Sequence, residues 1–401
     1  MKVLQANKFF FRNGGSETVM FQERDFLLAQ GHEVIDFSMD DPRNFESPYR
    51  DHFVANQDYR GPQGKLAKLR TAAQFIHSGG AARKMYALVR ETRPDIVHCH
   101  NIYHQLTPSI IGAAKRGGAK VVLTLHDYKP VCPVYNRLRQ DKPCSDCLDG
   151  AFSNVLKHRC ANGSLGKSAL LYAEATVQKW LGNYEQVDAF IAPSRFMAEA
   201  IAHRVPESRS RLLYNGVDLD GIQPSQTDEG YALFLGRLSP EKGVETLLKA
   251  HAAAQGKWPL HIAGTGPLEE TLKLKYPQAK FLGHISGEQL QHTLEGAAVV
   301  VVPSEWYENC PMSVLEAMAY GKPVIGSRMG GIPELVVDGA TGLLFQAGDA
   351  YDLQSRLDQV MQDLTLRQRL GAQARQRVEQ EFSLSRHNTC LMAIYTTLLG
   401  G

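Results

Sequence analysis

The chain has 401 residues, of which 43% are hydrophobic and 21% are charged, and its net charge is +2. This composition is typical of a globular protein with a large core, and the length allows about two domains. The near-neutral charge argues against a partner nucleic acid held by bulk positive charge. The N-terminal stretch 1–15 lacks the apolar run of a signal peptide. No segment approaches the ~20 apolar residues of a transmembrane helix, so we expect a cytoplasmic protein.

Short apolar runs alternate with helical periodicity throughout the first half. Helices are predicted at 17–31 and 108–118, each closed by glycine. Buried strands are predicted at 34–37, 95–100, 121–127 and 189–194.

The segment 60–90 is basic and contains no acid. Its bases are Arg60, Lys65, Lys68, Arg70, Arg83, Lys84 and Arg90, beside apolar residues at helical spacing (Leu66, Leu69, Ala73 and Ile76). One interpretation is a helix that rests on an anionic membrane surface, which would make the protein peripheral on the inner face of the cell membrane. The other is a solvated helix whose apolar stripe packs inward.

The second half repeats the alternation. Strands are predicted at 232–238, 260–266, 280–285, 298–304 and 323–327, and the turn-rich stretch 214–231 separates the two halves. Strand and helix alternation on this scale indicates parallel sheets covered on both faces. The sequence therefore predicts an α/β protein of two Rossmann-like doubly wound domains.

The stretch 303–327 places two acids, Glu308 and Glu316, around a predicted helix start near Pro311. Proline suits the first turn of a helix, which would begin at the C-terminal edge of the sheet, where such domains bind ligands. The free N–H groups of Met312, Ser313 and Val314 would bind an anion, and carboxylates accept hydrogen bonds from sugar hydroxyls. A phosphorylated sugar would fit this combination. The alternative for Glu316 is a buried ion pair or a cap.

Two cations follow the predicted strand that ends at Gly236. Arg237 and Lys242 lie in the loop before the next helix, and together they suit a diphosphate. Either residue alone would be a weak signal, but with the two glutamates the signal is strong.

Motifs in both halves resemble family 4 glycosyltransferases, which are retaining enzymes of the GT-B fold. In the second half the resemblance rests on NGVD (215–218), GRLSPEKG (236–243), AGTGPLEE (263–270), PSEWYENCPMSVLEAMAYGKPVI (303–325) and GGIPELVVDGATGLLF (330–345). In the first half it rests on GGSETV (14–19), AQGHEV (29–34), PDIVHCHN (94–101), TLHD (124–127) and APSRFMAE (192–199). It spans nearly the whole chain.

The resemblance implies a nucleotide diphosphate sugar as donor. Glu316 would bind the ribose hydroxyls and Glu308 would face the donor sugar, while His126 would contact the sugar near the reacting centre. The alternative for His126 is a core histidine. The implied catalytic residues are Glu308, His126, Arg237 and Lys242. The implied donor-binding residues are Gly14, Gly15, Arg237, Lys242, Gly264, Glu308, Met312, Ser313, Val314 and Glu316. Many members have Gly where this chain has Pro311, so we expect a different loop backbone there.

The family reaction transfers a sugar with retention at the anomeric carbon, and its leaving group is a diphosphate. Arg237, Lys242 and the helix N–H groups would stabilise the developing charge. The resemblance implies a front-face mechanism without a protein nucleophile. We expect no catalytic metal, because no acid pair of the DxD type stands at a strand end.

Four of the seven cysteines lie close together in the sequence: Cys132, Cys144, Cys147 and Cys160. A Cys-x2-Cys pair with one thiol on either side matches a four-thiolate structural zinc site. A disulfide is not expected in a reducing compartment. The alternative is that these residues are small buried hydrophobic groups in an insertion. Cys99, Cys310 and Cys390 are expected to be structural.

These observations predict an N-terminal acceptor-side domain, 1–214, joined by a C-terminal helix at 383–401, and a nucleotide-sugar domain, 215–382, with the active site in the cleft between them. The expected reaction is sugar transfer to a saccharide or lipid-linked saccharide acceptor in cell-surface polysaccharide synthesis. One rival is a nucleotide-sugar 2-epimerase of the same fold. The other is a non-catalytic binding subunit of a polysaccharide assembly complex. The donor base and sugar, the acceptor and the oligomeric state cannot be predicted from the sequence.

Overall fold

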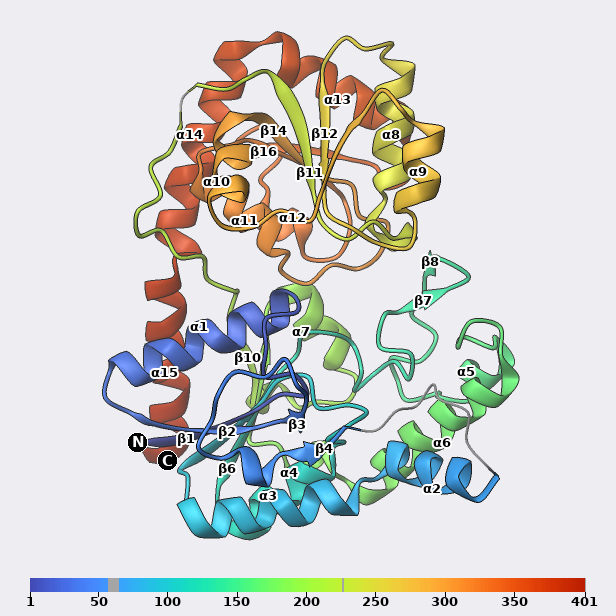
Figure 1. Ribbon diagram of the computed structural model, residues 1–401, viewed down its shortest axis with the longest axis vertical. Coiled ribbons are helices and arrows are strands. Elements are labelled where there is room, and N and C mark those ends of the chain that lie inside the picture. The colour runs from blue at the N-terminus through green and yellow to red at the C-terminus, as the bar shows by residue number, and fades with distance from the viewer. Residues whose placement is uncertain (57–64, 226, 401) are drawn as a thin grey trace. The chain divides into compact units, whose positions relative to one another are not determined.

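The computed structural model describes residues 1–56, 65–225 and 227–400, and the chain divides into two compact units. The first comprises Met1–Gln140, Cys144–Leu213 and the C-terminal residues from Asn388, and the second is built mainly on Tyr214–His387. Each unit contains a six-stranded parallel sheet with helices packed around it (Figure 1). The predicted pair of doubly wound, Rossmann-like folds is therefore confirmed.

The first sheet has the order β10-β9-β6-β5-β1-β2, with every neighbouring pair parallel. Its strands are β1 (Lys2–Ala6), β2 (Glu33–Phe37), β5 (Ile96–Cys99), β6 (Lys120–Thr124), β9 (Ala189–Ala192) and β10 (Ser210–Leu212). The strand order reverses between β1 and β5, because β2 adds to one side of β1 and the later strands add to the other. Open parallel sheets bind ligands at the carboxyl ends of the strands at such a point.

The helices and short elements of this unit connect the strands. The α-helices are α1 (Gly15–Ala29), α2 (Lys65–Ile76), α3 (Gly79–Thr92), α4 (Ser109–Gly117), α5 (Asn154–Lys157), α6 (Leu165–Leu181) and α7 (Arg195–Ile201). Short 3-10 turns lie at Arg50–His52, Tyr184–Gln186 and Glu207–Arg209, and two-residue strands are β3 (Met39–Asp40), β4 (Val54–Ala55), β7 (Leu138–Arg139) and β8 (Lys142–Pro143). Strands β1 and β10 were not predicted.

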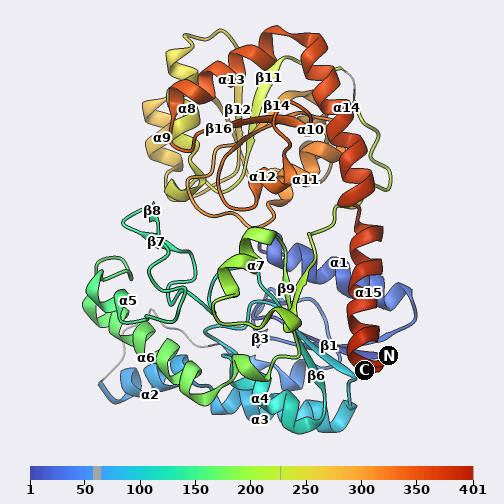
Figure 2. The same ribbon diagram turned by 180° about the vertical axis from the view of Figure 1, so that it is seen from behind.

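The last helix, α15 (Leu384–Gly400), contributes to the core of the first unit. Leu391 and Tyr395 are fully buried and belong to one apolar cluster with Val3 of β1 and Leu27 of α1. Figure 2 shows α15 running beside α1 and the sheet.

The second sheet has the order β13-β12-β11-β14-β15-β16 and is also parallel throughout. Its strands are β11 (Tyr231–Leu235), β12 (Leu260–Ala263), β13 (Lys280–Gly283), β14 (Ala297–Val302), β15 (Val324–Ser327) and β16 (Gly342–Phe345). Here the order reverses between β11 and β14. The loops after these two strands are the ones in which the sequence places Arg237, Lys242 and Glu308.

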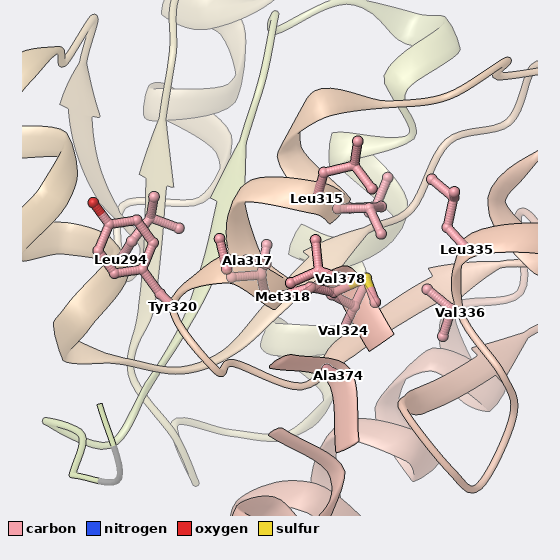
Figure 3. Packing of buried hydrophobic residues seen from close by; sticks show 14 of the residues in the cluster. Leu294, Leu315, Ala317, Met318, Tyr320, Val324, Leu335, Val336, Ala374 and Val378 are labelled. Carbon is pink, nitrogen blue, oxygen red and sulfur yellow. The ribbon is translucent and has the colours of Figure 1, made fainter. Parts of the chain in front are cut away.

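Helices cover both faces of this sheet. They are α8 (Val244–Ala253), α9 (Glu269–Lys275), α10 (Gly287–Gly296), α11 (Met312–Ala319), α12 (Ile332–Leu335), α13 (Ala350–Gln362) and α14 (Leu364–Glu381), with a 3-10 turn at Pro240–Lys242. Ala317 and Met318 of α11 are buried in an apolar cluster with Val324, Ala374 and Val378 (Figure 3). This packing fixes the position of α11 at the edge of the sheet. Within the described residues, no helix is long and apolar enough to cross a membrane.

Candidate functional site

The point of reversal in the second sheet brings Lys242 and Glu308 into direct contact. Lys242 ends the 3-10 turn after β11, and its Nζ lies 2.7 Å from Oε1 of Glu308 in the loop after β14. The hydroxyl of Ser304 donates to the same Oε1 at 2.7 Å. Arg237, in the first of these loops, is exposed. Its guanidinium has no hydrogen bond or ion pair with any residue in the described part of the chain.

The charge of Lys242 keeps Glu308 ionised. Burial of the Glu308 carboxyl acts to raise its pKa, but the ammonium charge and the hydrogen bonds from Lys242 and Ser304 outweigh burial and lower the pKa. The same ammonium lies 5.0 Å from the centroid of the Trp306 ring. The loops after β11 and β14 thus hold a cation and a carboxylate side by side, at the edge of the sheet where a ligand would bind.

Glu316 is in a different situation, although it lies only one helix turn into α11. Its side chain is half-buried, and burial raises the pKa of its carboxyl. Among the residues that the structure describes, none donates a hydrogen bond to this carboxylate or forms an ion pair with it. A partly desolvated acid without a protein partner is destabilising, so such a group indicates a site that a ligand completes. The predicted alternative, a buried ion pair or a cap, finds no support here.

The start of α11 agrees with the prediction of a helix that begins near Pro311. Pro311 is the N-cap residue with extended backbone (φ −66°, ψ 122°), and Met312 is the first helical residue. The N–H of Val314 donates to the carbonyl of Pro311 at 3.1 Å, so the prediction that it is free was wrong. The N–H groups of Met312 and Ser313 have no backbone acceptor in the described residues. These two remain for an anion.

Two glycines allow the surrounding loops to approach each other. Gly330 has a φ of +58°, and a Cβ there would lie 2.2 Å from the carbonyl oxygen of Glu308. The next residue, Gly331, donates its N–H to that carbonyl at 2.7 Å. Gly264 has a φ of +137°, and a Cβ would lie 1.8 Å from the carbonyl oxygen of Gly236. Only glycine fits at either position, so Gly264 shapes the loop that carries Arg237.

Gly14 and Gly15 lie at the corresponding point of the first sheet, where the loop after β1 ends and α1 begins. Gly14 is the N-cap of α1 with extended backbone, and a Cβ on it would meet only Glu17 Oε2 at 3.6 Å. Nothing within the described protein therefore requires glycine at position 14. A bound group that approaches this backbone closely would require it.

A buried hydrogen-bond network holds this loop in place. Asn7 follows β1 and donates from Nδ2 to Glu17 Oε1 at 3.1 Å, and its Oδ1 accepts from the N–H of Asn101 at 2.9 Å. Asn101, which follows β5, donates from Nδ2 to Ser16 Oγ at 2.9 Å. The two loops at the point of reversal are thus tied together.

His126 belongs to a chain of buried polar groups. Its Nε2 lies 3.0 Å from Nδ1 of His100, and Nε2 of His100 lies 3.6 Å from Oε2 of Glu23. The same carboxylate oxygen lies 3.3 Å from Nδ1 of His98. Glu23, His98 and His100 are almost completely buried, whereas His126 is half-buried. His126 is therefore not a fully buried core histidine, and its ring is oriented by the contact with His100.

The three residues Glu23, His98 and His100 were not predicted as functional. Their ligand atoms lie within 4.8 Å of one another, but a metal is disfavoured because both ring nitrogens of His98 are engaged. Nδ1 lies 2.7 Å from the Tyr395 hydroxyl and Nε2 lies 2.7 Å from Thr124 Oγ1. The two histidines of the motif HCH (98–100), at the end of a predicted strand, could have indicated this group. Glu23 lies on a helix far away in the sequence, and its spacing from the motif gives no sign of the contact.

Asp127 adjoins His126 and lines a small cavity with His100 and Lys129. Burial raises the pKa of Asp127 to about 7, although the N–H of Lys129 donates to its Oδ1 at 2.9 Å and two lysines lie nearby. Lys129 itself forms a buried ion pair with Glu174, with 2.5 Å between Nζ and Oε2. The carboxyl beside His126 therefore changes its charge near neutral pH.

The four clustered cysteines of the first unit surround one cavity. Cys132 is buried, and Cys144, Cys147 and Cys160 are half-buried. Of the other three, Cys99 and Cys310 are buried and Cys390 is half-buried.

Two family models match the chain in succession. "Glycosyltransferase Family 4" matches residues 13–220, more than half of the chain, and "Glycosyl transferases group 1" matches residues 218–377. A curated relative, the sulfoquinovosyl transferase SQD2 of Arabidopsis thaliana, is 29% identical over 300 residues, which cover 72% of this chain and 54% of the relative. The match thus spans about half the length of that relative.

Solved structures of this architecture cover the whole chain. A sucrose-phosphate synthase from Thermosynechococcus elongatus has a TM-score of 0.73 at 21% identity, covering 100% of this chain and 99% of its own. Anabaena Alr3699/HepE, solved in complex with UDP-glucose, has a TM-score of 0.69 at 18% identity, covering 99% and 100%. These likenesses confirm the predicted GT-B fold. The chain belongs to Glycosyltransferase Family 4, a family of sugar-transferring enzymes.

Proposed function

We propose that the protein is a retaining glycosyltransferase that moves a hexosyl group from a nucleotide diphosphate sugar to a saccharide or lipid-linked saccharide acceptor, in cell-surface polysaccharide synthesis. The observation that carries this proposal is the set of groups at the reversal point of the second sheet. An unpartnered Arg237, the Lys242–Glu308 pair, two helix N–H groups and the unpartnered carboxylate of Glu316 occur together at one edge. Membership of the family and the likeness to a protein solved with UDP-glucose support it.

Each group has a place in this proposal. Glu316 accepts hydrogen bonds from the two ribose hydroxyls, which offset the desolvation that raises its pKa. Arg237 binds the diphosphate through its planar fork, and the N–H groups of Met312 and Ser313 add neutral donors. Lys242 has three donors, so it can bind a phosphate oxygen while it retains Glu308. Glu308 then faces the donor sugar as an ionised acceptor.

In the proposed reaction, the bond from the anomeric carbon to the phosphate oxygen breaks and a bond to the acceptor oxygen forms on the same face. The acceptor proton passes to the departing phosphate oxygen, so no protein nucleophile is required. Arg237 and Lys242 stabilise the negative charge that develops on the leaving diphosphate, an effect of several kcal/mol in comparable sites. No step is assigned to a metal.

We assign the acceptor side to residues 1–214 with the helix 383–401 and the donor side to residues 215–382. His126 would contact the sugar near the reacting centre, and the backbone of Gly14 and Gly15 would approach the diphosphate. Packing within the described protein does not require glycine at position 14, and this supports the proposed contact between the Gly14 backbone and the diphosphate.

We also propose that α2 contacts an anionic membrane surface from the cytoplasmic side. Leu69 is 74% exposed, and Lys68 and Arg70 on either side of it are exposed. Arg60 lies outside the described residues, as do the side chains of Lys65 and Leu66. Flotation with anionic vesicles would test this: binding should fall with salt and with Leu69→Glu. Flotation that is unchanged in Leu69→Glu would contradict it.

A donor screen tests the main proposal. Purified protein is incubated with a panel of nucleotide sugars and saccharide-lipid acceptors, and both released nucleoside diphosphate and glycosylated product are measured. The proposal predicts acceptor-dependent release, a product with the anomeric configuration of the donor, and loss of both in Arg237→Ala. Conversion of the donor to its 2-epimer would favour the epimerase instead. Nucleotide binding without any turnover would favour a binding subunit.

A further inference from the structure

The segment 128–163, between β6 and α6, has little regular structure. It contains the two-residue strands β7 and β8 and the four-residue helix α5. Six of its residues other than glycine have a positive φ: Tyr135, Arg137, Gln140, Asp141, Arg159 and Asn162. A loop of this length with so little secondary structure is uncommon in a compact unit. Small irregular segments are commonly held by a disulfide or a structural metal.

Four thiols of this segment share one cavity. Cys132, Cys144, Cys147 and Cys160 line the same cavity, although they are spread over the whole segment. Four thiolates in one cavity would repel one another unless a cation neutralised them.

A buried cation lies beside the cavity. Arg137 is 5% exposed and is held beside Cys144, donating from Nε to its carbonyl at 3.3 Å and from Nη2 to Ser145 Oγ at 2.8 Å. A positive charge at this place suits a site whose net charge is negative.

We propose that these four cysteines bind one structural zinc ion as thiolates. Binding would release four protons to solvent, and the resulting site of one Zn²⁺ and four thiolates would carry a charge of −2, next to the guanidinium of Arg137. The ion ties the start of the segment (Cys132), the stretch after β8 (Cys144 and Cys147) and the turn after α5 (Cys160) to one point. Tetrahedral thiolate coordination by a Cys-x2-Cys pair and two further thiols is typical of structural zinc.

The sulfur atoms are not yet at coordination distance. Within the described residues, the group whose ligand atoms all lie within 4.8 Å of one another is Glu23, His98 and His100, and the cysteines are not in it. Zinc would therefore draw the four sulfurs together, which couples metal binding to the folding of the segment. The competing arrangement is a disulfide between two of the four. The proposal is independent of the sugar-transfer activity proposed above.

The test measures metal directly. The full chain is purified through a tag that does not bind metal, without chelators, and its zinc content is determined by mass spectrometry. We expect about one Zn²⁺ per chain, and loss of most of it in Cys144→Ser and Cys147→Ser. Cys390→Ser is the matched control, since Cys390 is also half-buried and lies outside the cavity, and it should retain its zinc.

A second measurement identifies the ligands. Zinc is exchanged for Co²⁺, and we expect the intense thiolate-to-cobalt charge-transfer bands of a tetrahedral four-sulfur site in the wild type, weakened or shifted in each serine variant. Because the readout is the wild-type spectrum, a variant that fails to fold does not remove the test. A folded wild type that contains no zinc and takes up no Co²⁺ would overturn the proposal. So would an intact disulfide among the four cysteines in protein kept under reducing conditions.

Discussion

Lys242 Nζ lies 2.7 Å from Glu308 Oε1, although 66 residues separate the two in the sequence. The pair joins the loops after β11 and β14, the two strands between which the order of the second sheet reverses. Glu308 is nearly buried, whereas the Lys242 side chain is 27% exposed. The ammonium can therefore reach a ligand while the carboxylate stays within the protein.

Lys242→Met should destabilise the protein, because it leaves a buried carboxylate without its counter-charge. We expect the free energy of unfolding to fall by about 2 kcal/mol, below the value for a fully buried pair because the lysine is partly exposed. Urea unfolding at pH 7 measures this. Lys273→Met is the matched control: Lys273 Nζ also lies 2.7 Å from an acid, Glu269, but on an exposed helix face, so stability should change little.

The loss should also depend on pH. The folded-state pKa of Glu308 is lowered, so its contribution to stability is fully present above the unfolded pKa of about 4.3 and is lost as the pH falls through the folded value. The wild type and Lys242→Met should therefore differ most at neutral pH and converge in acid. A difference that stays constant from pH 7 to the acid limit would show that the ion pair is not its cause.

Glu316→Gln should have the opposite effect on stability. The folded-state pKa of Glu316 is raised by burial, so the wild type loses stability as the pH rises from about 4.3 through the folded value. Removing the charge should leave the free protein equally or more stable at pH 7. Affinity for a nucleotide sugar should fall about tenfold or more, because a hydrogen bond to a charged group contributes about 1.5–3 kcal/mol.

Glu308 and Glu316 can therefore serve as controls for each other in stability measurements. Glu308→Gln weakens its interaction with Lys242 and should destabilise the free protein, whereas Glu316→Gln should not. Thermal unfolding with and without nucleoside diphosphate separates the two effects, since a ligand that binds only the folded state raises the melting temperature. If Glu316→Gln destabilises the free protein as much as Glu308→Gln, Glu316 has a structural partner and the ribose assignment fails.

The fold was largely predictable because buried parallel strands are continuous apolar runs. The run of valines within Ala297–Val302 strongly favours a buried strand, and β14 occupies that range. Strand β1 was missed because Gln5 interrupts its apolar pattern, although Gln5 is buried in the structure. Strand β10 has only three residues, none of them fully buried, so it lacks the pattern altogether.

The candidate site residues could be identified where their chemistry is local in sequence. Arg237, Lys242, Glu308 and Glu316 lie in loops and a helix start that follow recognisable strands. The contact between Lys242 and Glu308 was not predictable, because it depends on which two strands are neighbours in the sheet. The same holds for Glu23 and His100, which belong to a helix and a strand end that meet only in the folded unit.

His100→Ala should lower the rate of sugar transfer without weakening donor binding. His100 Nδ1 lies 3.0 Å from His126 Nε2, so its removal takes away one contact that orients the ring proposed to contact the sugar. A misplaced group near the reacting centre can lower kcat about a hundredfold. Affinity for the nucleoside diphosphate, whose assigned contacts include neither His100 nor His126, should be unchanged.

His100→Asn, which retains a side-chain donor and acceptor, should recover part of the rate. His292→Ala, at an exposed position of the second unit, serves as the neutral control. An equal loss of kcat in the alanine and asparagine variants, at unchanged stability, would show that the bond to His126 is not what matters.

Asp127→Asn should remove a pH dependence of stability near neutrality. Burial raises the folded-state pKa of Asp127 to about 7, whereas the unfolded value is about 3.9. Between these values the folded protein holds a proton that the unfolded chain has lost, so this carboxyl makes the wild type progressively less stable as the pH rises from about 4 to 7. Asp127→Asn should therefore gain stability relative to the wild type over that range, measured by urea unfolding at several pH values.

Asp41→Asn is the contrasting control, since the bond from Arg43 lowers the pKa of Asp41 and its contribution to stability is instead lost in acid. Parallel stability curves for the wild type and Asp127→Asn would mean that Asp127 is ionised throughout, and the carboxyl beside His126 would then carry a fixed charge.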